Sequence, residues 1–268
     1  MNSLDVFSPH LLAGKTALVT GGGSGIGRGI ALVFAAHGAR VTLVGRTREK
    51  LDAVASEIRA KGGEALACAA DVREFDAVER ACTETATTFG RLDIVVNSAA
   101  GNFLSPASAL SANGFRAVID IDLCGTFNVS RAAFAHLERS GGGCIVNITA
   151  TQADVPTPFQ AHAGAAKAGI AKLTRDLALE WSKQRIRVVA VAPGPIEDTE
   201  GMRRLSPGPA ADAFKKRVPL GRYGTIDEIA AAVLYLVSPA ASYVTGTTWL
   251  VDGGTSLAGA GPFLDLLG

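Results

Sequence analysis

The chain has 268 residues, of which 48% are hydrophobic and 19% are charged, and its formal net charge is +1. This length suits one α/β domain, and this composition argues against extensive disorder. The near-neutral charge gives no broad attraction to nucleic acid or to an anionic membrane, and no run reaches the about 18 apolar residues of a membrane span.

Apolar, β-rich runs alternate with helical stretches along most of the chain. This alternation predicts a parallel sheet with helices on both faces, a Rossmann-type doubly wound α/β fold. Continuous apolar runs such as Val188–Val191 are typical of strands buried on both faces. The expected strands are Thr16–Thr20, Arg40–Val44, Ala65–Ala69, Leu92–Val96, Cys144–Ile148, Ile186–Ala192 and Thr247–Val251. The expected helices are Gly25–His37, Arg48–Lys61, Phe75–Thr88, Asn113–Glu138, Gly164–Ser182 and Ile226–Val237.

One irregular stretch, Pro193–Thr225, interrupts this alternation with several prolines and a charged cluster. A loop this long inside a compact domain is typical of a lid or a binding segment. We therefore predict a single domain over residues 1–268, with a substrate lid within about 195–225.

The cysteines and the N-terminal segment bear on the compartment. The N-terminal segment has Asp5 and no lysine or arginine before Lys15, unlike a signal peptide, and the final Leu-Leu-Gly is not a peroxisomal address. Four cysteines form neither a CxxC pair nor a cluster with histidine: Cys68, Cys82, Cys124 and Cys144. We expect reduced thiols, no metal site and a cytoplasmic protein.

A glycine-rich turn follows the first expected strand and opens the first helix. Glycines let the backbone approach a pyrophosphate closely, and the helix N-terminus offers it free N–H groups. The strand, turn and helix stand in the order that a dinucleotide site requires. The predicted cofactor contacts in this turn are Gly21, Gly23, Ser24, Gly25, Ile26 and Gly27.

The end of the second strand indicates which nicotinamide nucleotide binds. An Asp or Glu there bonds the ribose hydroxyls of NAD, whereas an arginine accommodates the extra phosphate of NADP. The strand ends in Gly45-Arg46-Thr47-Arg48, without an acid. We therefore predict NADP(H) as the cofactor, with Arg46 at its phosphate.

With these residues the chain resembles the short-chain dehydrogenase/reductase family over about residues 11–254. The strings Asp71-Val72, Asn97-Ser98-Ala99-Ala100 and Pro193-Gly194-Pro195-Ile196 carry the resemblance further. It implies cofactor contacts by Asp71, Val72, Asn97, Ala99, Lys167, Pro193, Gly194, Ile196 and Thr199.

The usual catalysts of this family are a serine, a tyrosine and a lysine, with an asparagine behind them. Lys167 matches the lysine, but Ala163, Ala150 and Asp122 stand at the tyrosine, serine and asparagine positions. All three tyrosines of the chain lie at or beyond residue 223. Three alternatives follow: a protein that only senses NADP(H), a different proton donor, or a different reaction.

Longer strings are similar to the peroxisomal type of 2,4-dienoyl-CoA reductase, a group within the family. They include Ala99–Leu104, Gly125–Arg131 and Val146–Thr151. Such enzymes reduce 2,4-dienoyl-CoA with NADPH to 3-enoyl-CoA. The resemblance implies that Asp122 and Lys167 form the catalytic pair, acting through a water. It also implies acyl-CoA contacts by Arg73, Phe103, Ser111, Asn113 and Arg204.

Three further expectations complete the interpretation. His162 precedes Lys167 by five residues and so points about 140° away from it on an ideal helix, which argues against a catalytic role. The resemblance implies a homotetramer. Two alternatives stay open: another NADP(H)-dependent oxidoreductase acting on a different acyl-thioester or enone, and a non-catalytic NADP(H)-binding regulator.

Overall fold

Seven parallel strands form one sheet in the computed structural model, which describes residues 3–199 and 215–260. Their order is β3-β2-β1-β4-β5-β6-β7, so the chain leaves β1 toward one edge and returns past it to the other. This confirms the predicted Rossmann-type doubly wound fold. The strands are β1 (Thr16–Thr20), β2 (Arg40–Gly45), β3 (Ala65–Ala69), β4 (Ile94–Asn97), β5 (Gly143–Ile148), β6 (Ile186–Pro193) and β7 (Thr248–Val251).

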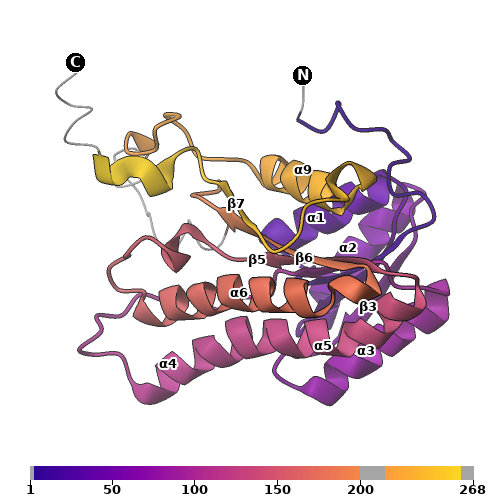
Figure 1. Cartoon of the computed structure of the whole chain (residues 1–268), viewed down its shortest axis with the longest axis horizontal. Helices are drawn as coiled ribbons and strands as arrows, with labels where there is room; N and C mark the ends of the chain where they lie inside the picture. The colour runs from indigo at the N-terminus through magenta and orange to yellow at the C-terminus, as the bar shows by residue number, and fades with distance from the viewer. Residues whose placement is uncertain (1–2, 200–214, 261–268) are drawn as a thin grey trace.

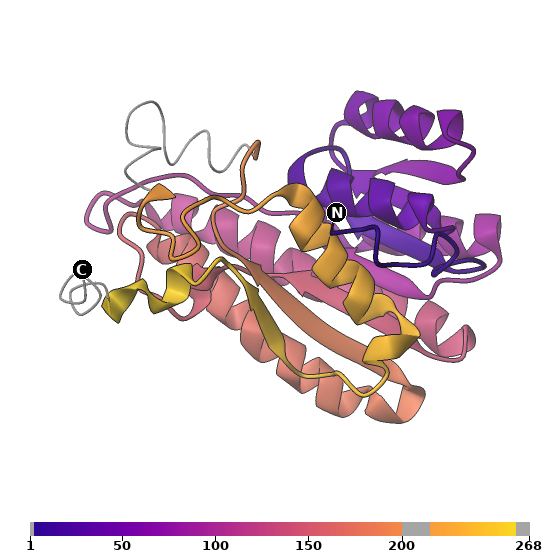
Figure 2. The same cartoon turned by 90° about the horizontal axis from the view of Figure 1, so that it is seen from above.

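Helices cover both faces of the sheet (Figure 1). On one face α1 packs against α9, and on the other α3 packs against α5 and α4 against α6. Viewed from above, α9 lies across the sheet beside β7 (Figure 2). The helices are α1 (Gly25–Ala36), α2 (Arg48–Ala60), α3 (Phe75–Phe89), α4 (Ala112–Ile119), α5 (Gly125–Arg139), α6 (Ala161–Glu180) and α9 (Ile226–Val237).

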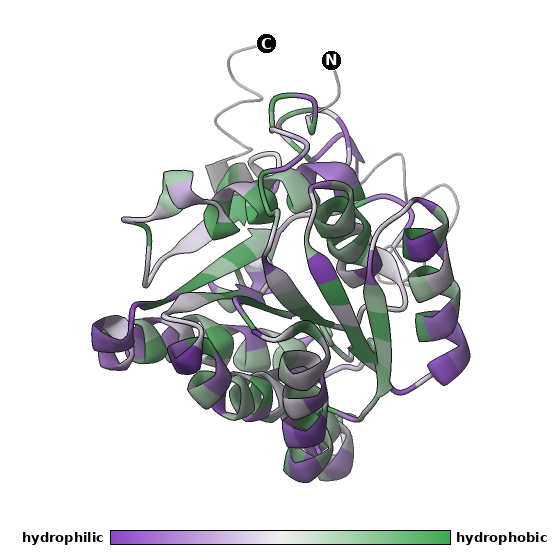
Figure 3. Ribbon diagram, turned by 90° about the vertical axis from the view of Figure 1, so that its right-hand side faces the viewer, coloured by the Kyte–Doolittle hydropathy of each residue, from purple (hydrophilic) through white to green (hydrophobic). Residues whose placement is uncertain are grey.

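The sheet separates two apolar clusters, and its strands contribute to both. Along β1, Ala17 and Val19 belong to the cluster under α1 and α9, whereas Leu18 belongs to the cluster under α3 and α5. Successive side chains of a strand point to opposite faces, so a strand covered on both sides has no polar face. Figure 3 shows these apolar strands at the centre, with hydrophilic residues on the outer faces of the helices.

The expected helix Asn113–Glu138 is not one regular helix. The structure divides it into α4, a π-helical turn over Asp120–Cys124 and α5. A π turn holds an extra residue, and such turns are frequent at functional sites. Here the turn carries Asp122, whose carbonyl accepts a 2.6 Å hydrogen bond from Thr126 Oγ1. The apolar periodicity of the flanking helices did not reveal it, because each flank keeps an ordinary helical pattern.

Other boundaries moved by a few residues. Helix α6 begins at Ala161, three residues before the expected start at Gly164. The predicted lid within 195–225 includes residues 200–214, which lie outside the described residues, so only its two ends can be placed. Among the described helices, none is both long and apolar enough to cross a membrane.

Candidate active site

A cavity of about 890 Å³ opens at the carboxyl ends of the strands. Its lining comes from the segments that follow all seven strands, with further residues from the π turn and α6, on both sides of the point where the strand order reverses beside β1. Ligands of open α/β sheets bind at this place, because the diverging connections leave a crevice there. The site thus lies where the fold alone predicts it.

The glycine-rich turn forms one wall of the cavity, and all six residues predicted there line it: Gly21, Gly23, Ser24, Gly25, Ile26 and Gly27. Gly25 has a φ of +52°, and a Cβ built on it would meet no atom within 4 Å, because it faces open space. A Cβ on Gly27 would lie 2.5 Å from the Gly21 carbonyl oxygen. The turn therefore leaves room for a phosphate beside the free N–H groups of α1, and only glycine fits at its base.

Two basic side chains line the neighbouring wall. Arg46 follows β2 as predicted, and Lys50, one turn into α2, joins it. Asp71 follows the neighbouring strand β3 and is held by Arg73 through hydrogen bonds of 2.6 to 3.1 Å. These bonds with Arg73 keep the pKa of Asp71 below its usual value. This wall suits the adenosine end of a dinucleotide.

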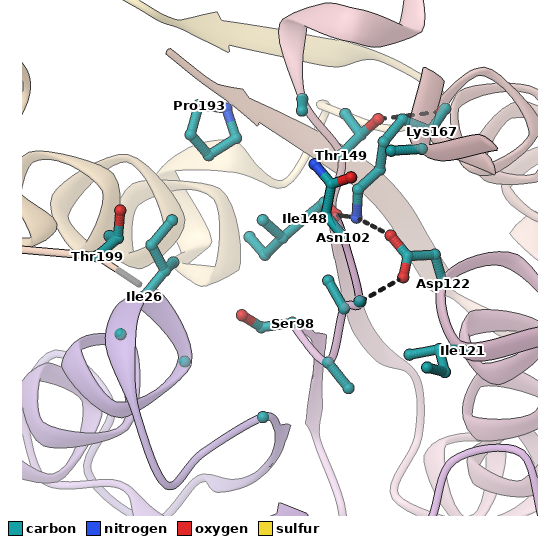
Figure 4. A pocket seen from close by; sticks show the side chains of 18 of the residues that line it. Ile26, Ser98, Asn102, Ile121, Asp122, Ile148, Thr149, Lys167, Pro193 and Thr199 are labelled. Carbon is teal, nitrogen blue, oxygen red and sulfur yellow. Dashed lines mark hydrogen bonds and ion pairs between the residues drawn. The ribbon is translucent and has the colours of Figure 1, made fainter. Parts of the chain in front are cut away.

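The floor of the cavity holds a buried ion pair (Figure 4). Lys167 Nζ lies 3.0 Å from Asp122 Oδ2 and donates to the Ile148 carbonyl oxygen at 3.1 Å. The other carboxylate oxygen of Asp122 accepts the Gly101 N–H at 2.7 Å. Asp122 is 1% exposed and Lys167 8%. Removing either charge leaves the other buried without its counter-ion, so the pair holds its geometry firmly.

The predicted catalytic pair is thus assembled from distant segments. Asp122 comes from the π turn after α4, and Lys167 comes from the second turn of α6. Ala150 and Ala163 line the cavity beside them, at the serine and tyrosine positions of the family. No hydroxyl side chain occupies either position.

Most other predicted cofactor residues also line the cavity: Val72, Ala99, Pro193, Gly194, Ile196 and Thr199. Asn97 does not. Its side chain lies beneath the cavity, where Nδ2 donates to Asn147 Oδ1 at 2.8 Å and to Ser130 Oγ at 3.0 Å. Asn97 therefore joins β4 to β5 and α5 rather than facing a ligand.

The predicted acyl-CoA contacts are not gathered in the cavity. Phe103 is 41% exposed, and Ser111 serves as the N-cap of α4 by accepting the Gly114 N–H at 3.0 Å. Asn113 is exposed in the first turn of that helix, and Arg73 is paired with Asp71. Arg204 lies outside the described residues. Phe103, Ser111 and Asn113 belong to the segment that runs from β4 into the first turn of α4, whereas Arg73 lies between β3 and α3.

His162 is completely buried and does not line the cavity. Its ring packs at 4.4 Å, edge-on, against Phe103, and neither ring nitrogen has a hydrogen-bond partner among the described residues. Burial lowers its pKa, and the negative charge of Asp122 partly opposes that shift. Its position agrees with leaving it out of the catalytic set.

Sequence reasoning missed several polar residues of the cavity. Asn102, Gln152 and Gln160 line it together and are joined by hydrogen bonds between their amides. Gln160 precedes Ala163 by three residues and Lys167 by seven, which is the spacing of one helical face. That spacing was a usable signal in the sequence.

The family model described as Enoyl-(Acyl carrier protein) reductase matches residues 21–256. The chain belongs to the short-chain dehydrogenase/reductase family. Within this family it is 49% identical over 252 residues to the peroxisomal 2,4-dienoyl-CoA reductase of Rattus norvegicus, named as (3E)-enoyl-CoA-producing. That match covers 93% of this chain and 86% of the rat protein.

Two bacterial proteins are also similar to this chain. The chain is 44% identical to a protein of Bacillus subtilis named "Probable 2,4-dienoyl-CoA reductase" and (2E)-enoyl-CoA-producing, over 90% of this chain and 96% of that one. Its fold matches the gluconate 5-dehydrogenase of Burkholderia cenocepacia, solved with NADP and tartrate, with a TM-score of 0.88. That match has 34% identity and covers 93% of this chain and 98% of the other.

Proposed function

We propose that the protein reduces 2,4-dienoyl-CoA to 3-enoyl-CoA with NADPH. The observation that carries this proposal is the buried Asp122–Lys167 pair, which stands beside two alanines at the family's serine and tyrosine positions. A carbonyl reductase of this family needs its tyrosine as proton donor. Reduction of a conjugated diene instead needs a proton at carbon, which a carboxylate–ammonium pair can deliver through water.

The residues present fit a phosphorylated dinucleotide. The glycine turn and the N-terminus of α1 would hold the pyrophosphate, and Arg46 with Lys50 would hold the additional phosphate. Lys167 would also bond the nicotinamide ribose, and Pro193, Gly194, Ile196 and Thr199 would line the nicotinamide end. Reduction requires a hydride at the far end of the diene, which NADPH supplies when it is bound here.

The chain's own groups then move the proton. The Lys167 ammonium has three N–H donors and uses two of them, on Asp122 and on the Ile148 carbonyl. Its third donor is available on the cavity side, where a water and a hydroxyl of the nicotinamide ribose would share it. Asp122 accepts a hydrogen bond from that water, so the ion pair orients the water. The water delivers a proton to the α-carbon of the substrate, and the ion pair then returns a proton to the water.

The substrate's CoA portion is a large anion, and we propose that it binds along the α4 side of the cavity. Arg73, Phe103, Ser111, Asn113 and Arg204 remain the predicted contacts. Arg73 would exchange its exposed bond with Asp71 for a phosphate, which its planar guanidinium suits. A homotetramer and a cytoplasmic location remain predictions, and light scattering of the purified protein tests the first.

One experiment tests the reaction. Oxidation of NADPH is followed with and without 2,4-hexadienoyl-CoA, and the product is identified by mass spectrometry and NMR. We expect turnover to the 3-enoyl-CoA. Turnover to the 2-enoyl-CoA, the product type in the name of the Bacillus relative, would move the protonation site. NADPH binding without turnover of any thioester or enone would favour the regulator.

A further inference from the structure

We propose that Gln160 is the hydrogen-bond donor to the thioester carbonyl oxygen of the substrate, an inference that rests on the proposed function. Reduction of the diene drives negative charge through the conjugated chain onto that oxygen. A donor aimed at the developing charge is often the largest single contribution to catalysis. The family's serine and tyrosine would supply hydroxyl donors, but Ala150 and Ala163 have none.

Gln160 is held in one orientation by two neighbouring amides. Its Oε1 accepts from Asn102 Nδ2 at 2.6 Å and from Gln152 Nε2 at 2.7 Å. With both hydrogen bonds on the oxygen, the amide nitrogen is turned the other way. Gln160 as a whole is only 6% exposed, so the few atoms that reach a surface do so in the cavity that it lines.

The nitrogen of Gln160 is open to that cavity. In the described part of the chain, this nitrogen has no hydrogen-bond partner. It is not among the fully buried polar atoms without a partner, so part of its surface is accessible. An amide NH₂ group donates and cannot accept. It therefore recognises an oxygen, and two hydrogen bonds accepted at its own carbonyl polarise it into a stronger donor.

The backbone places this amide close to the catalytic pair. Asn102 directly follows Gly101, whose N–H binds Asp122, and Figure 4 shows Asn102 in the same pocket as Asp122 and Lys167. Gln160 occupies the N-cap position of α6, where its side chain makes no capping hydrogen bond, and the face of that helix continues through Ala163 to Lys167. The small side chain of Ala163 leaves the space between the amide and the ammonium open.

The residue before Gln160 has a strained backbone that sets the direction in which the chain enters α6. Phe159 has a φ of +64°, which is costly for a side chain of its size, and its carbonyl accepts the Ser105 N–H at 2.9 Å. The turn thus holds Gln160 against Asn102 before α6 begins. Proton delivery at the α-carbon and charge stabilisation at the adjacent carbonyl then come from two ends of one helix face.

Two substitutions test the donor. Gln160→Glu keeps an oxygen that can accept from Asn102 and Gln152 but presents a second oxygen to the cavity. Gln160→Met removes the donor without adding charge. We expect kcat for 2,4-hexadienoyl-CoA to fall by about 100-fold or more in both, with a much smaller change in KM. Asp154→Asn, the reverse exchange at an exposed position of the same loop, is the matched control and keeps wild-type kcat.

A spectroscopic measurement separates this donor from a structural role. The complex of the protein with NADP⁺ and dienoyl-CoA labelled with ¹³C at the thioester carbonyl cannot turn over, so the carbonyl stretch can be recorded by infrared spectroscopy. We expect a shift to lower frequency in the wild-type protein and its loss in Gln160→Met. NADPH binding and thermal unfolding of each variant verify the fold.

The outcomes distinguish the two proposals. A Gln160→Met variant with kcat within threefold of wild type, or with the carbonyl shift retained, overturns the role of Gln160 and leaves the reductase intact. A wild-type protein that binds dienoyl-CoA without reducing it overturns the proposed function. In that case the infrared shift of the carbonyl stretch still tests whether Gln160 donates a hydrogen bond to the substrate. Absence of any dienoyl-CoA binding overturns both.

Discussion

The two ends of the cavity are made from different parts of the chain. The dinucleotide end is mainly the backbone of one continuous turn, in which Gly25 faces open space and Gly27 fits where a Cβ would collide. The reaction end is made of side chains from separate segments, chiefly Asp122, Lys167 and Gln160. Backbone geometry can be recognised from glycine spacing, whereas a side-chain constellation exists only after folding.

The two ends of the cavity should also differ in which property of the protein they control. The glycine turn serves any chemistry that uses a dinucleotide, because it contacts only phosphates. Under the proposed function, the reaction end determines which bond is reduced, since it would supply the proton and the donor to the developing charge. Substitutions should therefore divide into those that affect cofactor binding and those that affect turnover alone.

The largest effect is expected at the buried pair. Asp122→Ala should reduce turnover by at least about 1000-fold, because the proton relay loses its carboxylate, while NADPH still binds. The unpaired Lys167 should also lower the free energy of unfolding by about 3–5 kcal/mol. NADPH oxidation, NADPH fluorescence titration and urea unfolding measure the three quantities. Turnover at the wild-type rate would remove Asp122 from the mechanism.

A double replacement serves as the control for that variant. Asp122→Leu combined with Lys167→Met removes both charges and keeps similar volumes, so most of the lost stability should return. Activity should not return. If the double variant is as unstable as Asp122→Ala, the loss arises from packing around the π turn and not from an isolated charge.

At the dinucleotide end the expected effect is on affinity. Arg46→Ala should raise the Kd for NADPH by about 10- to 100-fold, the loss of one charge-assisted phosphate contact, and leave the Kd for NADH unchanged. Arg48→Ala is the matched control, because Arg48 is exposed, lies two residues on and is paired with Asp52 at 2.9 Å. Equal losses for both nucleotides would show that Arg46 does not bind the additional phosphate.

The fold and the dinucleotide end could be predicted from the sequence for the same physical reason. The strand Thr16–Thr20 is buried along its whole length around an apolar centre, and the turn after it needs glycines at fixed positions. Both signals are local. The boundaries were less accurate, as at α6, because hydrogen-bonded caps decide them.

The reaction end was predicted only through a resemblance. Nothing local in the sequence joins Asp122 to Lys167, forty-five residues away, and the π turn that presents Asp122 leaves the helical periodicity on either side intact. Gln160 was missed because its role depends on two amides from other segments. Asn97 was assigned to the cofactor from its motif, yet its hydrogen bonds run beneath the cavity.

A smaller effect is expected at Asn97, where a substitution should change stability without changing cofactor binding. Asn97→Ala should lower the free energy of unfolding by about 1–3 kcal/mol, since Asn147 Oδ1 loses its donor in a buried position. The Kd for NADPH should change by less than about threefold. Urea unfolding and fluorescence titration measure both, and Ser130→Ala, at the other bond of the same amide, is the comparison variant. A large loss of NADPH affinity at unchanged stability would return Asn97 to the cofactor site.

The smallest effect is expected at an ion pair outside both ends of the cavity. Glu228 lies 2.6 Å from Arg222 and completes a capping box with Thr225 at the start of α9. Hydrogen bonding to Arg222 and to the Thr225 backbone outweighs partial burial and lowers the pKa of Glu228 to about 2. A depressed carboxyl pKa stabilises the folded state above the unfolded value near 4.3, and this stabilisation is lost as the pH falls toward 2.

Glu228→Gln should therefore cost about 1 kcal/mol at neutral pH, and the difference from wild type should shrink as the pH falls below about 4. Turnover should not change, because the pair is exposed and the relay does not include it. Urea unfolding at several pH values measures the cost, with Asp227→Asn in the same helical turn as the control. A cost that stays constant with pH would assign the stability to the shape of the cap. A loss like that of Asp122→Ala would mean that burial does not distinguish the two ion pairs.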